Sequence, residues 1–376
     1  MIRVLLDQKI AKDTLSFKGV YFMETEEARY EFGNTNKQIF IEALEDGFKI
    51  YNENRLFLFR NNDVVTFKSS ATDAEFLLDQ KSYTGDCIIL KSDSTHLSYI
   101  NNIDLETYLK GVVPAEIFTN NSSYMEAVKA QAVCARTYAL NRMQKNKQKK
   151  YDVLADVRDQ VYGGKSGRTA IGDDAVDLTA GSILMDKQGL AVTYFHSSCG
   201  GMLEDAESVW PGSNQDYLSS RQDVVGREFA DKESPYYHWQ KKLNPSQLDS
   251  LFTENLKISP LTAPVADTID IPMTFKIVDR TASGRVKTLA VQYGTQRKDL
   301  SGYDIRRFLG WPSGKLLPST LFRFTQNDSL LIIDGAGNGH GVGMCQYGAM
   351  YKSQKGLQYY HILQSYFPGT YLKKVY

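Results

Sequence analysis

The sequence predicts an α+β protein of mixed architecture, with a long alanine-rich central helix, mostly antiparallel sheets and β-rich accessory modules. Three observations favour this class. The first hundred residues are short runs of β-branched and aromatic residues, separated by Asn, Asp, Gly and Ser. A helical stretch dense in alanine follows, and later segments return to the strand pattern. The length of 376 residues fits two or three domains.

The N-terminal region predicts small sheets joined by tight turns, from runs such as IRVLL, IFIEAL, LFLFR and CIILK. A long helix is predicted from near Ser123 to about Met143, with Glu126 in the capping-box position. Small residues let a helix pack closely against its neighbours, so we expect this one to be central. Its alanines are Ala127, Ala130, Ala132, Ala135 and Ala139.

Further along, residues 156–164 predict a strand that enters a double-glycine turn. FKIVDRTASGRVKTLAVQYG predicts a hairpin that turns at Ser283 and Gly284, and SGYDIRRFLG predicts a short helix. The last part predicts a strand, a glycine loop and a helix. We therefore expect a β-rich region over 1–100, a catalytic core over 101–230 and 326–376, and a β-rich inserted module over 231–325.

Composition excludes several classes of protein. The 44 Lys and Arg residues balance 44 Asp and Glu residues, which gives no electrostatic reason to expect nucleic acid. The four cysteines include no C-x-x-C pair, so the sequence gives no support for a zinc finger or a thioredoxin-like protein. The sequence contains no run of about 18 apolar residues, so it predicts no membrane span. The opening MIRVLLDQKI does not fit a signal peptide, because its apolar run is short and a charge follows.

Glu116 is the first candidate for chemistry. Pro114 fixes the backbone two residues earlier, and apolar residues flank the segment GVVPAEI. A carboxyl in apolar surroundings has a raised pKa, which suits a general acid near neutral pH. The alternative is an exposed glutamate in a loop.

His196 and His340 are the next candidates. His196 ends an apolar strand before the loop SSCGG, and His340 lies in GAGNGHGVG, which lacks the Lys and Ser/Thr of a phosphate loop. Cys199 or Cys345 could act as a nucleophile with His340 or His196 as base. The same residue types suit zinc. Purely structural roles stay open for both histidines.

Six segments occur in this order: YLKGVVPAE, EAVKAQAVCARTYAL, QVYGG, YFHSSCGG followed by ESVW, SGRV, and GHGVGMCQYGA. Together they resemble the stage II sporulation protein D family, which includes the amidase-enhancer proteins, from about Ile103 to the C-terminus. The resemblance implies a lytic transglycosylase. Such an enzyme cleaves the MurNAc–GlcNAc β-1,4 bond of peptidoglycan strands that lack stem peptides, and leaves 1,6-anhydro ends.

The resemblance places the family's acid on Glu116. One carboxyl is enough, because the sugar's own C6 hydroxyl attacks and the same group acts first as acid and then as base. We expect substrate-binding residues around it, with Arg136 as a supporting partner. They are Gln160, Tyr162, His196, Ser197, His340 and Gln346. The resemblance also implies glycan strands and a cell-wall amidase as partners, and an extracytoplasmic location in the periplasm or cell wall.

Two departures from the family pattern matter. Some members bind zinc through cysteines at the positions of Leu154 and Asp159, so we expect that site to be absent and no cofactor to be needed. The family's serines in STSGG and GHGVGMSQ are replaced here by Cys199 and Cys345. Three alternatives stay open for this pair: a disulfide, a shared zinc with His340 or His196, and two independent buried thiols.

Two rival functions also stay open. One is a non-enzymatic glycan-binding or amidase-enhancing protein on the same fold. The other is a cysteine hydrolase that uses Cys199 or Cys345 with His340.

Overall fold

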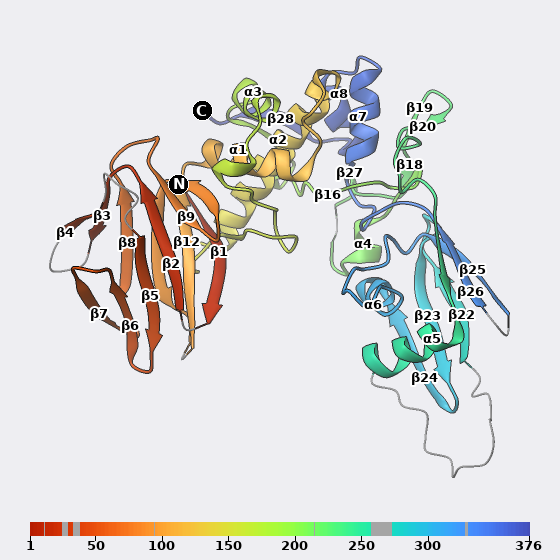
Figure 1. Ribbon diagram of the computed structural model, residues 1–376. Coiled ribbons are helices and arrows are strands. Elements are labelled where there is room, and N and C mark those ends of the chain that lie inside the picture. Colours follow the sequence, from red (N-terminus) through yellow and green to blue (C-terminus); the bar gives the residue numbers. More distant parts are fainter. Residues whose placement is uncertain are drawn as a thin grey trace, which may run out of the picture. The chain divides into compact units, whose positions relative to one another are not determined.

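The computed structural model describes residues 1–10, 12–24, 29–32, 38–93, 95–213, 215–256, 273–327 and 330–376. The chain forms two compact units, each with its own core (Figure 1). The first unit comprises Met1–Val192 and Tyr371–Tyr376, and the second comprises Thr193–Thr370. The four-part division expected from the sequence stays a prediction, and residues 257–272 of its inserted module lie outside the described residues.

Two sheets form the N-terminal part of the first unit. In the described residues, a seven-stranded sheet has the order β13-β1-β12-β11-β8-β3-β4 and a six-stranded sheet the order β10-β9-β2-β5-β6-β7. The strands are β1 (Ile2–Ile10), β2 (Lys12–Lys18), β3 (Tyr21–Glu24), β4 (Arg29–Phe32), β5 (Gln38–Leu44), β6 (Gly47–Tyr51), β7 (Leu56–Arg60), β8 (Val64–Ser69), β9 (Glu75–Leu78), β10 (Lys81–Thr84), β11 (Asp86–Lys91), β12 (His96–Ile103) and β13 (Val153–Leu154).

The two sheets face each other across an aromatic core. The strands alternate buried and more exposed residues, as Ile39 and Ile41 show in β5. The Phe17 ring of β2 lies 4.8 Å from the Tyr21 ring and 5.0 Å from the Phe67 ring, both on the other sheet. The predicted β-rich start and α+β class are therefore confirmed.

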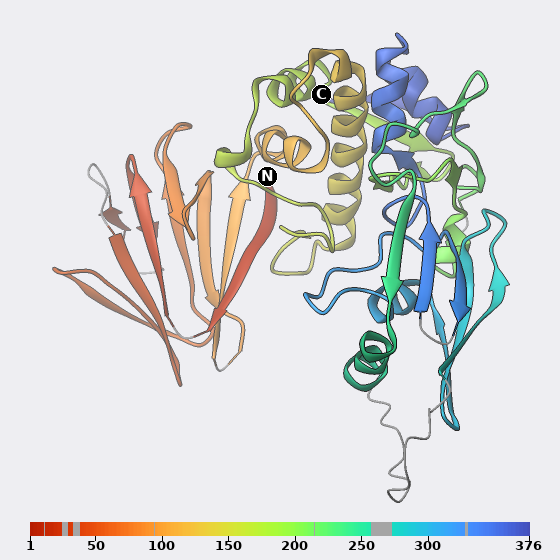
Figure 2. The same ribbon diagram turned by 45° about the vertical axis from the view of Figure 1, so that its right-hand side comes forward.

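A helical layer completes the first unit. It contains α1 (Leu105–Glu116), η1 (Ser122–Tyr124), α2 (Met125–Lys145), η2 (Lys165–Gly167) and α3 (Ala170–Leu178), with the sheet of β14 (Ser182–Asp186), β15 (Gly189–Leu190) and β28 (Tyr371–Lys374). Helix α2 packs against both α1 and α3, as Figure 2 shows for α1, and its five predicted core alanines are fully buried. Helix α2 begins at Met125, two residues after the predicted start near Ser123, and Asn121 caps the preceding turn.

The second unit begins with short strands and ends in a helix pair. Its first elements are β16 (Phe195–His196), β17 (Met202–Leu203), α4 (Ala206–Val209), β18 (Arg221–Gln222), β19 (Val224–Val225), β20 (Glu228–Phe229), β21 (Trp239–Leu243), α5 (Pro245–Ser250) and η3 (Leu251–Asn255). The rest are β22 (Met273–Arg280), β23 (Val286–Tyr293), β24 (Gln296–Ser301), α6 (Gly302–Phe308), β25 (Phe322–Asn327), β26 (Leu330–Gly335), β27 (Met344–Cys345), α7 (Gln346–Gln354) and α8 (Tyr359–Tyr366).

The predicted hairpin of β22 and β23 is present, as are the helix α6 and the strand, glycine loop and helix around β26 and α7. The strand predicted over 156–164 is wrong, because this segment is irregular. Side chains accept from the Arg158 and Val161 amides, and the Tyr162 and Gly163 amides donate to the carbonyls of Ala155 and Gly111. These amides are therefore not free to pair with a neighbouring strand. None of the helices in the described part of the chain is long and apolar enough to cross a membrane.

Helix α1 and the irregular segment meet at a glycine. The Gly163 amide donates to the Gly111 carbonyl at 3.0 Å. A Cβ on Gly111 would lie 2.5 Å from Tyr162 Cε2 and 2.8 Å from the Gly164 carbonyl oxygen. This close approach holds residues 161–164 against the last turns of α1, the end that carries Glu116.

We expect Gly111→Ala to destabilise the protein by about 1 to 2 kcal/mol. The clash costs more than the roughly 1 kcal/mol that alanine adds in helix propensity. Chemical denaturation measures the difference. Gly167→Ala is the matched control, because a Cβ at that position meets no atom within 4 Å. Equal stability of the two variants would contradict the close packing at Gly111.

Candidate active site

Glu116 is the last residue of α1 and is half-buried. The backbone N–H of Val161 donates to its Oε1 at 2.7 Å. Burial raises the pKa of the carboxyl from its usual 4.5 to about 7, although the bond from Val161 favours the charged form. Glu116 is therefore not an exposed loop residue, and part of the group stays protonated near neutral pH.

No basic side chain of the described residues forms an ion pair with Glu116. An opposite charge within about 4 to 6 Å would lower the pKa of the carboxyl and favour the anion. Without that charge, burial dominates. The carboxyl can therefore donate a proton to a bound molecule.

The irregular segment that binds Glu116 is fixed by Asp159. The Asp159 carboxylate accepts from the Tyr138 hydroxyl at 2.6 Å and from the Leu154 amide at 2.9 Å, and Arg142 Nε lies 3.0 Å from it. Its side chain is 2% exposed. Asp159 therefore holds the loop and does not present a second open carboxylate.

Arg136 braces the helical layer. Its guanidinium is fully buried, and Nε and Nη2 donate to the two carboxylate oxygens of Glu106 at 2.7 and 2.6 Å. Nη1 also donates to the Ser182 carbonyl at 3.1 Å. This placement ties α2 to α1 and β14 and leaves the guanidinium no exposed surface for a substrate. It is compatible with the supporting role expected from the sequence, and a contact of Arg136 with substrate stays a prediction.

Gln160 and Tyr162 lie on the segment next to Val161, and both are buried. The Tyr108 hydroxyl donates to Gln160 Oε1 at 3.3 Å, and the Tyr162 hydroxyl donates to Asn101 Oδ1 at 3.0 Å. In the structure, both side chains bond to the protein interior. They position the Val161 amide, and their contact with substrate stays a prediction.

The other predicted site residues belong to the second unit. Strands β16 and β27 pair in parallel, which places His196 opposite Cys345. The Ser197 carbonyl accepts from the Tyr347 amide at 3.1 Å. Gln346, the first residue of α7, is 8% exposed.

His340 lies in an aromatic cluster that sequence reasoning missed. Its ring centroid is 4.9 Å from Trp210 and 6.2 Å from Tyr194. Its Nδ1 accepts from the Val342 amide at 3.1 Å, and burial lowers its pKa to about 3. A neutral ring beside Trp210 can present an apolar face to a sugar. The sequence did contain a signal for this cluster. Trp210 ends the segment ESVW, which is among the segments that resemble the family.

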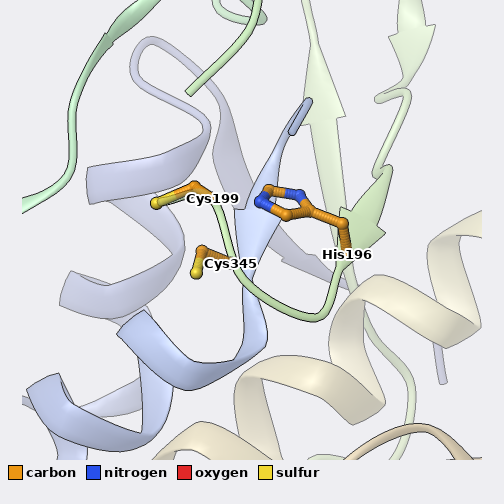
Figure 3. Close-up of side chains that lie close together, drawn as sticks. All are labelled: His196, Cys199 and Cys345. Atoms are coloured by element: carbon orange, nitrogen blue, oxygen red, sulfur yellow. The ribbon is translucent and has the colours of Figure 1, made fainter. Parts of the chain in front are cut away.

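The two cysteines are neighbours of His196. The ligand atoms of His196, Cys199 and Cys345 all lie within 4.8 Å of one another (Figure 3). Of the two histidines that the sequence left open for the metal alternative, His340 and His196, the structure gathers His196 with the sulfurs. Both thiols are buried and free, and burial raises the pKa of each. Raised thiol pKa values do not favour the rival function of a cysteine hydrolase.

The chain therefore combines an α+β fold, a buried acid on a helix end and a glycine loop that carries a histidine. The sequence profile described as "Stage II sporulation protein" matches residues 93–185, and a domain of unknown function matches residues 224–343. The stage II sporulation protein D of Bacillus subtilis is 30% identical over 286 residues, which are 72% of this chain and 75% of that protein. The chain belongs to the stage II sporulation protein D family.

Two further relatives extend the similarity. An uncharacterized protein of Brachyspira hyodysenteriae is 32% identical over 374 residues, which are 98% of this chain and 92% of that protein. The amidase enhancer of Bacillus subtilis is 29% identical over 297 residues. The match covers 70% of this chain but 40% of that protein.

We expect Glu116→Gln to change the pH dependence of stability. The folded chain keeps a proton on Glu116 that the unfolded chain releases between the ordinary pKa of 4.5 and the folded value of about 7. The stability from the neutral carboxyl is therefore complete below pH 4.5 and is lost as the pH rises through about 7. Glutamine stays neutral, so the variant should gain about 1 to 3 kcal/mol over the wild type above pH 7. Denaturation midpoints from pH 4 to 9 measure this gain. A difference that is constant with pH would contradict the raised pKa.

Proposed function

We propose that this protein is a lytic transglycosylase that cleaves the MurNAc–GlcNAc β-1,4 bond of peptidoglycan, with Glu116 as acid and then base. The observation that carries the proposal is the half-buried carboxyl at the end of α1, which has one bond from the Val161 amide and a pKa raised by burial. The similarity to the stage II sporulation protein D of Bacillus subtilis supports a role at the cell wall.

The reaction needs one carboxyl. Glu116 donates its proton to the bridging oxygen, and the bond between that oxygen and C1 of MurNAc breaks. The C6 hydroxyl of the same MurNAc bonds to C1 as the hydroxyl proton passes to the Glu116 carboxylate. The 1,6-anhydro ring closes, the GlcNAc hydroxyl is released, and Glu116 ends protonated with no water consumed.

The Val161 amide has a part in both half-reactions. Its N–H stabilises the carboxylate that exists after the first proton transfer, while burial stabilises the acid that exists before it. The two effects oppose each other and leave the pKa near neutrality. An acid that must also act as base is most effective when its pKa lies near the working pH.

The substrate class follows from composition and relatives. The 44 basic residues balance the 44 acidic residues, which gives no electrostatic reason to expect a strongly anionic polymer such as nucleic acid. We propose strands that lack stem peptides as the substrate, a cell-wall amidase as partner and an extracytoplasmic location, because one relative is named an amidase enhancer.

One rival keeps a specific observation in its favour. The aromatic cluster of Tyr194, Trp210 and His340 lies in the second unit and could bind a glycan without cleaving it. A non-enzymatic glycan-binding protein would need this cluster and not Glu116. The test below separates the two functions.

We expect Glu116→Gln to lower the rate of 1,6-anhydro product release at least about 10²-fold, because glutamine cannot donate the proton. Mass spectrometry of digests of amidase-treated peptidoglycan measures the products. Glu126→Gln is the matched control, because Glu126 of α2 pairs with Lys129 at a distance of 2.7 Å and is not part of the proposed reaction.

Three outcomes are informative. Loss of product in Glu116→Gln with normal release in Glu126→Gln supports the proposal. Release at the wild-type rate in Glu116→Gln contradicts it. Glycan binding without any product from the wild type favours the non-enzymatic rival.

A further inference from the structure

His196, Cys199 and Cys345 form a buried cluster in the second unit that the proposed reaction does not use. His196 comes from β16, Cys199 from the loop after it, and Cys345 from β27 at the start of α7. Figure 3 shows the three side chains next to one another, with both sulfurs on the same side of the His196 ring. The imidazole and two sulfur ligand atoms lie within 4.8 Å of one another. An imidazole and two thiols at this spacing are a donor set that suits zinc.

The His196 ring is oriented as a metal ligand would be. Its Nδ1 lies 3.0 Å from the Val342 carbonyl oxygen, which only a protonated Nδ1 can bond. The lone pair therefore lies on Nε2. That atom is buried and has no hydrogen-bond partner, on a residue that is 5% exposed. A metal-ligating histidine commonly donates its other ring N–H to a backbone carbonyl in this way.

An unpaired buried acceptor is costly, so Nε2 of His196 needs an explanation. A disulfide between Cys199 and Cys345 would leave Nε2 unpaired, and so would two unreacted thiols that bond elsewhere. The Cys199 thiol donates to Asp223 Oδ2 at 3.6 Å. A metal ion at the centre of the cluster would bind all three donor atoms at once.

Charge also favours a divalent cation. Burial disfavours a bare thiolate, and it raises the pKa of both cysteines. Two thiolates around a divalent ion form a neutral group, so the desolvation cost of the thiolates falls. Cys345 also caps α7, where its sulfur accepts from the Gly348 amide at 3.4 Å. A helix N-terminus stabilises a thiolate at this position.

Nearby charges balance each other. Arg285 donates to the Cys199 carbonyl at 2.8 Å. On the other side, Asp223 pairs with Lys352, and Asp231 accepts from the Gly200 amide at 2.7 Å. The carboxylates are already bonded, so they surround the cluster and need not serve as ligands.

We propose that His196 Nε2, Cys199 Sγ and Cys345 Sγ bind one zinc ion in the second unit. Binding releases two thiol protons to solvent and forms one Zn–N and two Zn–S bonds, with no change of oxidation state. Zinc–ligand distances of about 2.0 to 2.3 Å require only small movements of side chains already within 4.8 Å of one another. Three protein ligands leave a fourth position for water.

The zinc would cross-link parts of the second unit that are far apart in the sequence. His196 and Cys199 lie before the inserted strands, and Cys345 lies after them. The glycine loop that carries His340 runs directly into β27, which carries Cys345. A metal bound to Cys345 would therefore fix the end of this loop, whose His340 lies beside Trp210. This role is independent of Glu116, and the site can exist whether or not the protein cleaves glycan.

The test uses the whole protein, purified with and without added Zn²⁺, and elemental analysis of the metal bound. We expect one zinc per chain in the wild type. His196→Ala, Cys199→Ser and Cys345→Ser should each lower zinc retention during dialysis at least about tenfold. Cys134→Ser is the matched control, because it removes a fully buried thiol outside the cluster and should retain zinc.

Replacement with Co²⁺ gives a second readout that needs no variant. Thiolate-to-cobalt charge-transfer absorption in the wild-type protein is expected, and it would support the site even if a cysteine variant fails to fold. Absence of this band together with no retained zinc would overturn the proposal. A disulfide between Cys199 and Cys345 would overturn the proposal as well. Mass spectrometry of denatured, unreduced protein would show it as a mass two hydrogens lower than that of the dithiol form.

Discussion

The hydrogen bond from the Val161 amide to Glu116 is the interaction on which the first unit's chemistry depends. The bond is 2.7 Å long, and it fixes one oxygen of a half-buried acid. Without it, burial alone would favour the neutral acid and weaken the second proton transfer. With a cationic partner instead, the carboxyl would be charged at neutral pH and could not start the reaction.

The polar groups around Glu116 serve to hold that amide in place. Asp159 lies five residues after the end of β13 and accepts from the Tyr138 hydroxyl and the Leu154 amide. Arg136 joins α2 to Glu106 of α1, the helix that ends at Glu116. Buried charges of this kind add little net stability, but they fix geometry once every donor has a partner.

Local pattern predicted most of the fold and only part of the site. Alternation in β5 and the alanines of α2 have a direct local cause, so the α+β class and the central helix could be predicted. The segment 156–164 could not, because Glu116 lies 45 positions before the amide that it binds. The role of Arg136 depends on Glu106, 30 residues away. His196, and not His340, lies beside the two sulfurs because β16 pairs with β27. A local pattern in the sequence does not show this pairing.

Glu116 connects the sequence motif, the fold and the proposed reaction, so its protonation is the most direct thing to measure. A ¹³C NMR titration of the glutamate carboxyl carbons, with Glu116→Gln to identify the signal of Glu116, gives its pKa. A midpoint near pH 7 is expected from its burial. A midpoint near the usual 4.5 would show a charged carboxylate at neutral pH and would contradict the role of Glu116 as the acid.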